Sequence, residues 1–410
     1  MHPSKDIIFS KGKELEGKKI ALCVTGSVGC LRSIDICREL MRYGADVYVV
    51  MTESAVKLIS PDMFEWATGN PVVTELTGKI EHIALAGSHK ERCDLILVAP
   101  ATGNTISKIA AGIDDTPVLS VVTSALGSDI PVMIVPAMHE SMYRNLFIKE
   151  NLEKIKGSNI ELIAPKIEEG KAKIACVDEV VETVISKLYI KDAKDLNFLI
   201  TAGPTIEYID DIRFITNKSS GKMGVQIAKE VLRRGGNLNL VHGPLDITPP
   251  LNDNIIPIET SEEMHNKVTQ ILKNKKIDIF IGAAAVSDWT INKRYPGKIP
   301  SSEELKLNLI PSPKIIEKVK KLSPNTYLVI FKAEYDLTEE ELFKKSFDRL
   351  KAVNGNLVVA NDVSKKDTGF RSDINDVVII DRKGNMKYKG KEKKSYIGKK
   401  LMDIILKENF

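Results

Sequence analysis

Residues 20–29 read Ile-Ala-Leu-Cys-Val-Thr-Gly-Ser-Val-Gly, and residues 198–205 read Phe-Leu-Ile-Thr-Ala-Gly-Pro-Thr. Each stretch is an apolar strand pattern that breaks into a glycine-containing loop, and a helical pattern follows further along the chain. In such a turn, backbone N–H groups at a helix N-terminus can approach a phosphate closely. The chain therefore has two openings suited to nucleotide-type ligands, one in each half.

Short apolar runs alternate with helical patterns on both sides of a polar connector at residues 191–195. In the first half, strands are predicted over 20–24, 47–51, 95–99, 118–122 and 132–135, and helices over 33–43, 106–111, 142–155 and 179–188. In the second half, strands are predicted over 198–201, 239–242, 277–282, 328–331 and 357–360, helices over 225–234, 264–273 and 314–321, and a hairpin about 383–385. The alternation predicts an α/β chain of two doubly wound, mostly parallel-sheet (Rossmann-like) domains in tandem, over 1–190 and 191–410, with ligands at the C-terminal ends of the strands.

Length, charge and cysteine usage narrow the functional class. A chain of 410 residues suits two domains, and a net charge of +4 permits anionic substrates without indicating nucleic acid. The lysine-rich segment 387–400 is interpreted as a solvated surface rather than a binding patch. The first nine residues lack the apolar core of a signal peptide and no apolar run is long enough for a bilayer, so a cytoplasmic protein with no membrane partner is expected. None of the five cysteines forms a C-x-x-C pair, so a zinc site is not expected.

The loop after the first strand favours a mononucleotide over a dinucleotide. Gly26 and Ser27 begin a Gly-x-x-Gly turn, but the third glycine of the dinucleotide fingerprint is missing. The second strand also ends without an acidic residue and continues into Thr52. A flavin phosphate such as FMN fits this pattern better than NAD, and the alternative is a tight turn with no ligand.

Three further segments of the first half carry polar groups of possible chemical use. Residues 99–105 read Ala-Pro-Ala-Thr-Gly-Asn-Thr and residues 136–143 read Pro-Ala-Met-His-Glu-Ser-Met-Tyr, each after a predicted strand. His82 precedes the strand predicted at 95–99. Each signal is ambiguous by itself, because a lone histidine is more often a structural residue than a base.

Taken together with Ala-Cys-Val-Asp at 175–178, these segments resemble the homo-oligomeric flavin-containing cysteine decarboxylases over about residues 17–190. The resemblance implies FMN contacts from Gly26, Ser27, Thr52, Pro100 and Thr102, substrate contacts from Met138 and His139, a base at His82 and an acid at Cys176. Two positions depart from the family, since His139 replaces an asparagine and Val177 replaces a glycine. The alternative for Cys176 is a small buried hydrophobe.

The implied chemistry explains why a redox cofactor is needed. A carboxylate beside an amide nitrogen and a CH₂–SH group has no electron sink, so direct loss of CO₂ is prohibitively slow. Oxidation of CH₂–SH to a thioaldehyde provides a C=S group that accepts the electrons of the breaking bond to the carboxylate. The resulting enethiolate is then protonated and reduced. The cofactor carries the electrons while the protein positions the substrate.

The second half contains the richest motif of the chain. Residues 215–224 read Ile-Thr-Asn-Lys-Ser-Ser-Gly-Lys-Met-Gly and run directly into a predicted helix. Hydroxyls, a glycine and a lysine at a helix N-terminus indicate an anion site. The motif is not a P-loop, because Lys222 is followed by Met223. The alternative is a well-capped helix start without a ligand.

A second polar cluster follows the strand predicted at 277–282. Residues 282–289 read Gly-Ala-Ala-Ala-Val-Ser-Asp-Trp, and small residues at a strand end allow a nucleotide to approach. Asp288 can hold Mg²⁺-linked waters, a ribose or a base edge, and Lys298 can neutralise phosphate. The alternative for both side chains is a solvated loop position.

These motifs, with Phe331 and the Ala-Asn-Asp-Val segment at 360–363, resemble phosphopantothenate–cysteine ligases over about residues 195–405. The resemblance implies that Asn217 stabilises an acyl-nucleotide intermediate, that Lys298 contacts the triphosphate, and that Asp288 and Phe331 frame the nucleotide. It further implies substrate contacts from Ser219, Ser220, Gly221, Lys222, Ala283, Ala284 and Asn361, and it leaves Lys345, Arg349 and Lys351 as candidates for a later basic pair. Pro300 and Ser301 stand where the family often has lysines.

The order of the two halves resembles the bifunctional phosphopantothenoylcysteine synthetase/decarboxylases of coenzyme A biosynthesis. The resemblance implies CTP-dependent ligation of cysteine to 4′-phosphopantothenate with Mg²⁺, then FMN-dependent decarboxylation to 4′-phosphopantetheine by a homo-oligomer. The preference for CTP over ATP rests on the resemblance alone. Two rivals remain, a reductase or flavin-modifying enzyme and a regulatory protein that binds the same ligands without turnover.

Overall fold

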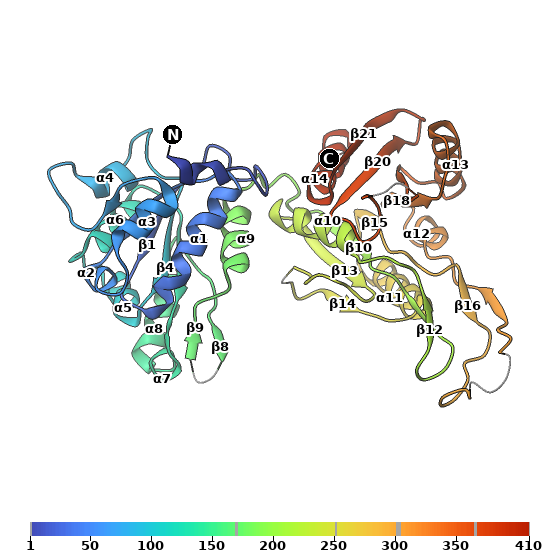
Figure 1. Ribbon diagram of the computed structural model, residues 1–410, viewed down its shortest axis with the longest axis horizontal. Coiled ribbons are helices and arrows are strands. Elements are labelled where there is room, and N and C mark those ends of the chain that lie inside the picture. The colour runs from blue at the N-terminus through green and yellow to red at the C-terminus, as the bar shows by residue number, and fades with distance from the viewer. Residues whose placement is uncertain (1, 169–170, 251, 301–304, 365–366, 410) are drawn as a thin grey trace. The chain divides into compact units, whose positions relative to one another are not determined.

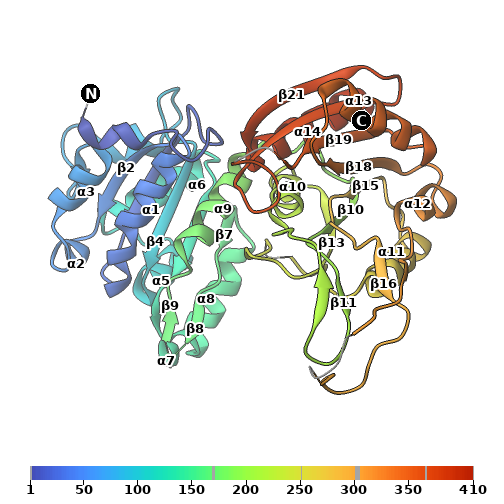
Figure 2. The same cartoon turned by 45° about the vertical axis from the view of Figure 1, so that its right-hand side comes forward.

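The computed structural model describes residues 2–168, 171–250, 252–300, 305–364 and 367–409. The chain divides into two compact units, Met1–Tyr189 and Ile190–Phe410, each built around its own sheet (Figures 1 and 2).

The sheet of the first unit has six strands in the order β3-β2-β1-β4-β5-β7, all parallel. The strands are β1 (Lys19–Val24), β2 (Asp46–Met51), β3 (Val72–Val73), β4 (Leu95–Ala101), β5 (Val132–Pro136) and β7 (Ile160–Leu162). The chain moves outward from β1 to β3 and then returns to place β4 on the other side of β1. The strand order therefore reverses between β1 and β4, which is where doubly wound sheets bind ligands.

Helices cover both faces of this sheet (Figure 1). They are η1 (Pro3–Ile7), η2 (Val28–Cys30), α1 (Leu31–Arg42), α2 (Glu53–Val56), α3 (Pro61–Thr68), α4 (Glu81–Ala86), α5 (Gly103–Ala111), α6 (Pro117–Gly127), α7 (Glu140–Tyr143), α8 (Leu146–Lys156) and α9 (Val177–Leu188). One apolar core lies against α1, α3 and α9, and a second lies against α5, α6 and α8. A small antiparallel sheet of β6 (Met138–His139), β8 (Lys166–Glu168) and β9 (Lys171–Lys173) extends from the unit.

Two sequence-based expectations for the first unit are wrong. The run 118–122, predicted as a strand, lies inside helix α6. Thr116 caps this helix by accepting a hydrogen bond from the Leu119 amide, and Pro117 occupies its first turn. The helix predicted over 142–155 is broken, because Asn145 accepts hydrogen bonds from the amides of Phe147 and Ile148 and so begins α8 anew.

The sheet of the second unit has eight strands in the order β14-β13-β10-β15-β18-β19-β20-β21. They are β10 (Asn197–Ala202), β13 (Asn237–His242), β14 (Ile255–Pro257), β15 (Ile279–Gly282), β18 (Tyr327–Glu334), β19 (Leu357–Asp362), β20 (Ile374–Asp381) and β21 (Met386–Lys393). The pairs from β14 to β19 are parallel, and β20 and β21 are antiparallel. Two doubly wound, mostly parallel sheets in tandem confirm the predicted fold class, and the β20–β21 hairpin confirms the predicted turn at 383–385.

Within the described part of the second unit, five helices cover the sheet: α10 (Lys222–Arg233), α11 (Ser261–Asn274), α12 (Ile316–Leu322), α13 (Glu339–Ala352) and α14 (Lys394–Asn409). Helices α10 and α14 pack on one face and α11, α12 and α13 on the other. Two short antiparallel pairs extend from the unit, β11 (Ile206–Tyr208) with β12 (Phe214–Thr216), and β16 (Trp289–Ile291) with β17 (Leu309–Pro311). Among the residues described, no helix of either unit combines the length and apolar character that a bilayer crossing requires.

Candidate functional site

In the first unit, a cavity of about 510 Å³ lies at the C-terminal ends of β1, β2 and β4. Its lining includes the predicted residues Gly26, Ser27, Thr52, Thr102 and Met138. Three of these are helix N-caps, in which the hydroxyls of Ser27, Thr52 and Thr102 accept backbone hydrogen bonds at 3.3, 3.3 and 3.2 Å. Three loops thus present hydroxyl groups and helix starts to one space.

Close packing holds these loops in place. A Cβ atom added to Gly26 would lie 2.5 Å from Cβ of Ser54, so only glycine fits at that position. The Thr25 hydroxyl donates to the Pro100 carbonyl at 2.8 Å and accepts from the Thr102 amide at 3.1 Å. Pro100 is buried and does not line the cavity, so the structure places it as a support of the loop rather than at the ligand surface.

A neighbouring cavity of about 630 Å³ shares Ser27, Ala137 and Met138 with the first one. Its lining brings together Cys176 and His139, which are 37 residues apart in the sequence. The Cys176 thiol is exposed at the start of α9, with Sγ 3.8 Å from Oε2 of Glu179. Nδ1 of His139 lies 2.9 Å from the Ser141 hydroxyl.

The other cysteines are poor candidates for proton transfer. Cys23, Cys30, Cys37 and Cys93 are buried, and Cys176 alone of the five is exposed. Desolvation raises the pKa of the Cys93 thiol to about 12 and raises that of Cys23 still further. Accessible thiol chemistry in this chain therefore belongs to Cys176.

The structure does not bring His82 into either cavity. His82 lies in α4, is half-buried and is missing from both linings. Its Nδ1 is buried without a hydrogen-bond partner among the residues that the structure describes. A buried ring nitrogen without a partner is costly, so this atom needs an explanation.

The lining of the first cavity fits a flavin mononucleotide. Hydroxyls and the start of α5 suit a phosphate, and Lys108, which pairs with Asp115, also lines the cavity. Met138, Met142 and Leu119 supply apolar surface for a ring system.

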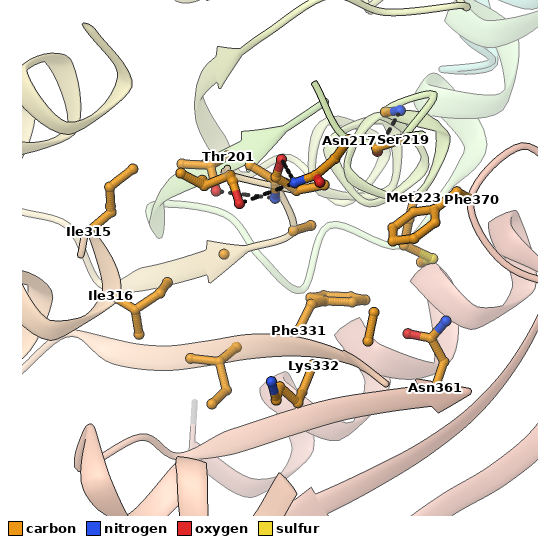
Figure 3. Close-up of a pocket in the computed structure, with 18 of the residues that line it drawn as sticks. Thr201, Asn217, Ser219, Met223, Ile315, Ile316, Phe331, Lys332, Asn361 and Phe370 are labelled. Carbon is orange, nitrogen blue, oxygen red and sulfur yellow. Dashed lines mark hydrogen bonds between the residues drawn. The ribbon is translucent and has the colours of Figure 1, made fainter. Parts of the chain in front are cut away.

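In the second unit, a cavity of about 420 Å³ opens at the C-terminal ends of β10, β15, β18 and β19 (Figure 3). Ten predicted residues line it: Asn217, Ser219, Gly221, Lys222, Ala283, Ala284, Asp288, Phe331, Arg349 and Asn361. They come from motifs that lie far apart in the sequence, and the ring of Phe331 lies near the centre of the side chains drawn in Figure 3.

Asn217 is held by the loop that follows β15. Its Nδ2 donates to the carbonyls of Ala285 at 3.0 Å and Val286 at 3.2 Å (Figure 3). Two acceptors for one amide nitrogen fix the orientation of the side chain, and the amide oxygen remains as its acceptor group.

Glycines let α10 begin against the sheet. Gly221 has φ of 72°, and a Cβ there would lie 2.1 Å from Cδ2 of Leu245. A Cβ on Gly224 would lie 2.5 Å from Cβ of Ala202 in β10. Only glycine allows this approach, which places the N-terminus of α10 at the cavity.

Four predicted residues of the second unit lie outside the cavity lining. Ser220 is buried and its hydroxyl donates to the Phe370 carbonyl at 2.6 Å. Lys298 is exposed in the loop after β16, Nζ of Lys345 lies 3.8 Å from Oε2 of Glu334, and Nζ of Lys351 lies 4.1 Å from the ring centroid of Phe347. Of the two residues that stand where the family often has lysines, Pro300 and Ser301, the second lies outside the described residues.

Sequence reasoning missed several lining residues, among them Lys314, Lys332, Asn375 and Lys394. Lys394 contradicts the expectation of a solvated lysine-rich surface, because it is 4% exposed. The sequence did carry a signal that this face of the helix is buried. Ile397, Leu401 and Ile405 follow Lys394 at helical spacing and are buried on the same face of α14.

Basic side chains predominate in the lining of the second-unit cavity, and four of them pair with carboxylates: Lys222 with Asp373, Lys314 with Asp288, Lys332 with Glu334 and Arg349 with Glu317. Its lining has five basic residues, Lys222, Lys314, Lys332, Arg349 and Lys394, and one acidic residue, Asp288. Asp288 Oδ1 accepts from Lys314 Nζ at 2.6 Å. Within the described residues, no cluster of three or more metal-ligating side chains occurs. One carboxylate fits Mg²⁺ bound mainly through the phosphates of a substrate.

Comparisons with known proteins cover both units. The Flavoprotein family matches residues 8–189, and the family described as DNA/pantothenate metabolism flavoprotein C-terminal domain matches residues 193–408. A protein from Thermococcus kodakarensis named coenzyme A biosynthesis bifunctional protein CoaBC is 48% identical over 93% of each chain. A CoaBC protein from Methanocaldococcus jannaschii is 40% identical over 96% of this chain and 95% of its own. The crystal structure of a CoaBC C-terminal domain shares 26% identity over 53% of this chain and 97% of its own, with a TM-score of 0.44.

Proposed function

Because the chain belongs to the family of coenzyme A biosynthesis bifunctional proteins (CoaBC), we propose that its second unit forms 4′-phosphopantothenoylcysteine and its first unit decarboxylates that product to 4′-phosphopantetheine. Membership makes the chain a flavoprotein enzyme of coenzyme A biosynthesis with a ligase and a decarboxylase activity. The substrates, the nucleotide and the residue roles below are parts of the proposal.

The convergence of separate motifs in one cavity rich in basic side chains carries the proposal for the second unit. A carboxylate cannot acylate an amine until its oxygen becomes a leaving group. In the proposed reaction the 4′-phosphopantothenate carboxylate attacks the α-phosphorus of a nucleoside triphosphate, and pyrophosphate leaves. Lys222 and Arg349 offset phosphate charge, and Asp288 holds water ligands of Mg²⁺. The nucleotide is CTP, and the intermediate is an acyl-cytidylate that cysteine then attacks.

Asn217 stabilises that intermediate in the proposed reaction. Its two bonds to the Ala285 and Val286 carbonyls hold the amide in one orientation before substrate arrives. Phe331 offers a ring face to the nucleotide base, and Ala283 and Ala284 keep the strand end small enough for close approach. Lys298, Lys345 and Lys351 contribute only if their loops and side chains move toward the cavity on binding.

For the first unit, the two adjoining cavities support flavin binding beside the substrate. FMN supplies the oxidation of the substrate CH₂–SH group and the return of the two electrons. Ser27, Thr52 and Thr102 would hold its phosphate, and Gly26 would let it approach the backbone. His139 and Met138 orient the substrate, with the imidazole N–H donating to the carboxylate. The Cys176 thiol gives a proton to the carbon that has lost CO₂.

His82 is the proposed base for the oxidation step. Its buried Nδ1 has no hydrogen-bond partner among the described residues, so the surroundings of this side chain are incomplete within one copy of the unit. A homo-oligomer in the cytoplasm is the proposed state of the protein. In such an assembly, a second copy can complete the environment of His82.

A coupled assay on variants tests both halves. The protein is incubated with 4′-phosphopantothenate, cysteine, CTP and Mg²⁺, and pyrophosphate, CO₂ and 4′-phosphopantetheine are measured. Cys176→Ser should release pyrophosphate at the wild-type rate and lose about 100-fold or more in 4′-phosphopantetheine formation, because the proton donor is gone. Asn217→Asp should slow ligation about 100-fold, because a carboxylate would face two carbonyl oxygens.

Asn266→Asp is the matched control, since Asn266 is exposed on α11 away from the cavity lining. Full product yields in Cys176→Ser or Asn217→Asp would refute that residue's role. A wild-type protein that binds flavin and releases neither CO₂ nor pyrophosphate would instead be a binding protein without turnover.

A further inference from the structure

Lys394 is a buried lysine at the first position of α14, and it lines the cavity of the second unit. Its exposed fraction is 4%, whereas Lys389, Lys391 and Lys393 before it in β21 are exposed. Burying a lysine is costly unless its charge is compensated, so the position needs a physical explanation.

The hydrogen bonds of Lys394 account for only part of that compensation. Its Nζ donates to the carbonyls of Gly369 at 2.7 Å and Phe370 at 3.2 Å. An ammonium group has three donors, so these two neutral acceptors leave one donor for another group. The same loop is fixed by the Ser220 hydroxyl, which also donates to the Phe370 carbonyl.

The charged groups that act on Lys394 are one basic residue, Lys222, and one acidic residue, Asp373. Lys222 approaches from the start of α10, where its Nζ donates to Oδ1 of Asp373 at 2.6 Å and to the Arg371 carbonyl at 3.3 Å. Asp373 precedes β20 and lies near enough to Lys394 to interact with it electrostatically, while Lys393 at the end of β21 acts on Asp373. The carboxylate of Asp373 is 82% exposed and already pairs with Lys222, so it compensates Lys394 weakly.

We propose that Lys394 and Lys222 together bind a phosphate group of one of the two phosphorylated ligase substrates, 4′-phosphopantothenate or the nucleoside triphosphate. This inference rests on the proposed ligase function. A phosphate between the two ammonium groups would compensate the buried charge of Lys394 and use its third donor. The start of α10 at Gly221 adds a favourable dipole to the same space.

The proposal gives phosphate binding a defined pH dependence. Burial, followed by repulsion from Lys222, lowers the pKa of Lys394 to about 8 in the ligand-free protein. Below that pH the side chain is charged and attracts phosphate, and above it the neutral amine loses most of that attraction. Apparent affinity for the phosphate substrate should therefore fall as the pH rises through about 8.

Steady-state kinetics of Lys394→Met and of the exposed control Lys391→Met test the proposal. For Lys394→Met, the KM for one phosphorylated substrate should rise about 10-fold to 100-fold, while the KM for cysteine and the kcat change less. The affected substrate, 4′-phosphopantothenate or CTP, identifies the source of the phosphate. Unchanged KM values for both phosphorylated substrates, or a loss confined to kcat, would overturn the proposal.

Lys394→Arg keeps the test decisive if Lys394→Met folds poorly. Arginine retains the charge to much higher pH. The fall in kcat/KM above about pH 8 should therefore be absent in Lys394→Arg and present in the wild type. The same alkaline fall in both proteins would rule out Lys394 as its source. If the wild type consumes no 4′-phosphopantothenate at all, the proposed function fails and not this inference.

Discussion

At the scale of single residues, Arg234 is a buried cation whose ion pairs link separate parts of the second unit. Its guanidinium is 3% exposed, with Nε 2.7 Å from Oε1 of Glu230 and Nη1 3.0 Å from Oδ2 of Asp192, and it also binds Asp403. These carboxylates raise the pKa of Arg234 even though burial opposes its charge. One side chain thus joins α10, the polar connector and α14.

Replacing Arg234 by methionine should destabilise the protein by about 3 kcal/mol or more, because Glu230 would remain buried with less compensation. Urea unfolding followed by circular dichroism measures the change. Lys389→Met is the control, since Lys389 forms an exposed pair with Glu339 that is expected to contribute less than about 1 kcal/mol. Equal unfolding midpoints for both variants would contradict this account.

Residues that form compact motifs were predictable from the sequence, whereas residues that depend on long-range packing were not. Asn217 and Lys222 stand in one motif, so their shared location at a helix start could be predicted and they line one cavity. Lys394 lies 172 positions after Lys222 and lines the same cavity. Its place in a lysine-rich segment gave no signal that it is buried. The cavity position of Lys298 stays a prediction, because its loop lies outside the lining.

At the scale of elements, the approach of α10 to β10 sets the shape of the second-unit cavity. Gly224→Ala would place a Cβ 2.5 Å from that of Ala202, which has 0% exposure in the strand. The helix must then move, at a cost of about 1 to 3 kcal/mol. We expect lower pyrophosphate release with decarboxylation of added 4′-phosphopantothenoylcysteine unchanged.

The control for this variant is Gly398→Ala in α14. A Cβ at Gly398 would lie 3.5 Å from the Ile227 amide nitrogen, an ordinary contact, so ligation should continue. Separate assays of the ligase and decarboxylase steps distinguish the two outcomes. Normal ligase activity in Gly224→Ala would show that the close helix–strand contact is not required.

Element type was predictable where periodicity and turn chemistry agreed, as in the hairpin of β20 and β21. The prediction of a strand at 118–122 was wrong, because a short apolar run suits a buried strand or a buried helix equally well. The decision there came from the Thr116 cap and Pro117 before the run. The short pairs β11–β12 and β16–β17 gave little signal, because their few residues have no long alternating pattern.

At the scale of the whole molecule, two units with separate cores imply two pieces that fold separately. Among the residues that the structure describes, the cores of the first unit contain none beyond Tyr189, and those of the second begin at Ala193. Fragment 1–189 should therefore bind FMN, with the flavin absorbance that checks it, and fragment 190–410 should release pyrophosphate from CTP.

The contacts that residues 191–193 make with the second unit determine where a stable second fragment must begin. Ala193 has 0% exposure and its amide donates to the Arg234 carbonyl at 3.1 Å. Asp192 pairs with Arg234, and Nζ of Lys191 donates to the Arg233 carbonyl at 2.7 Å. A fragment that begins at Asn197 loses these contacts and should be about 2 to 4 kcal/mol less stable to urea than fragment 190–410. Equal stability of the two fragments would mean that the connector serves only as a link, and the boundary of the second unit would then lie at β10.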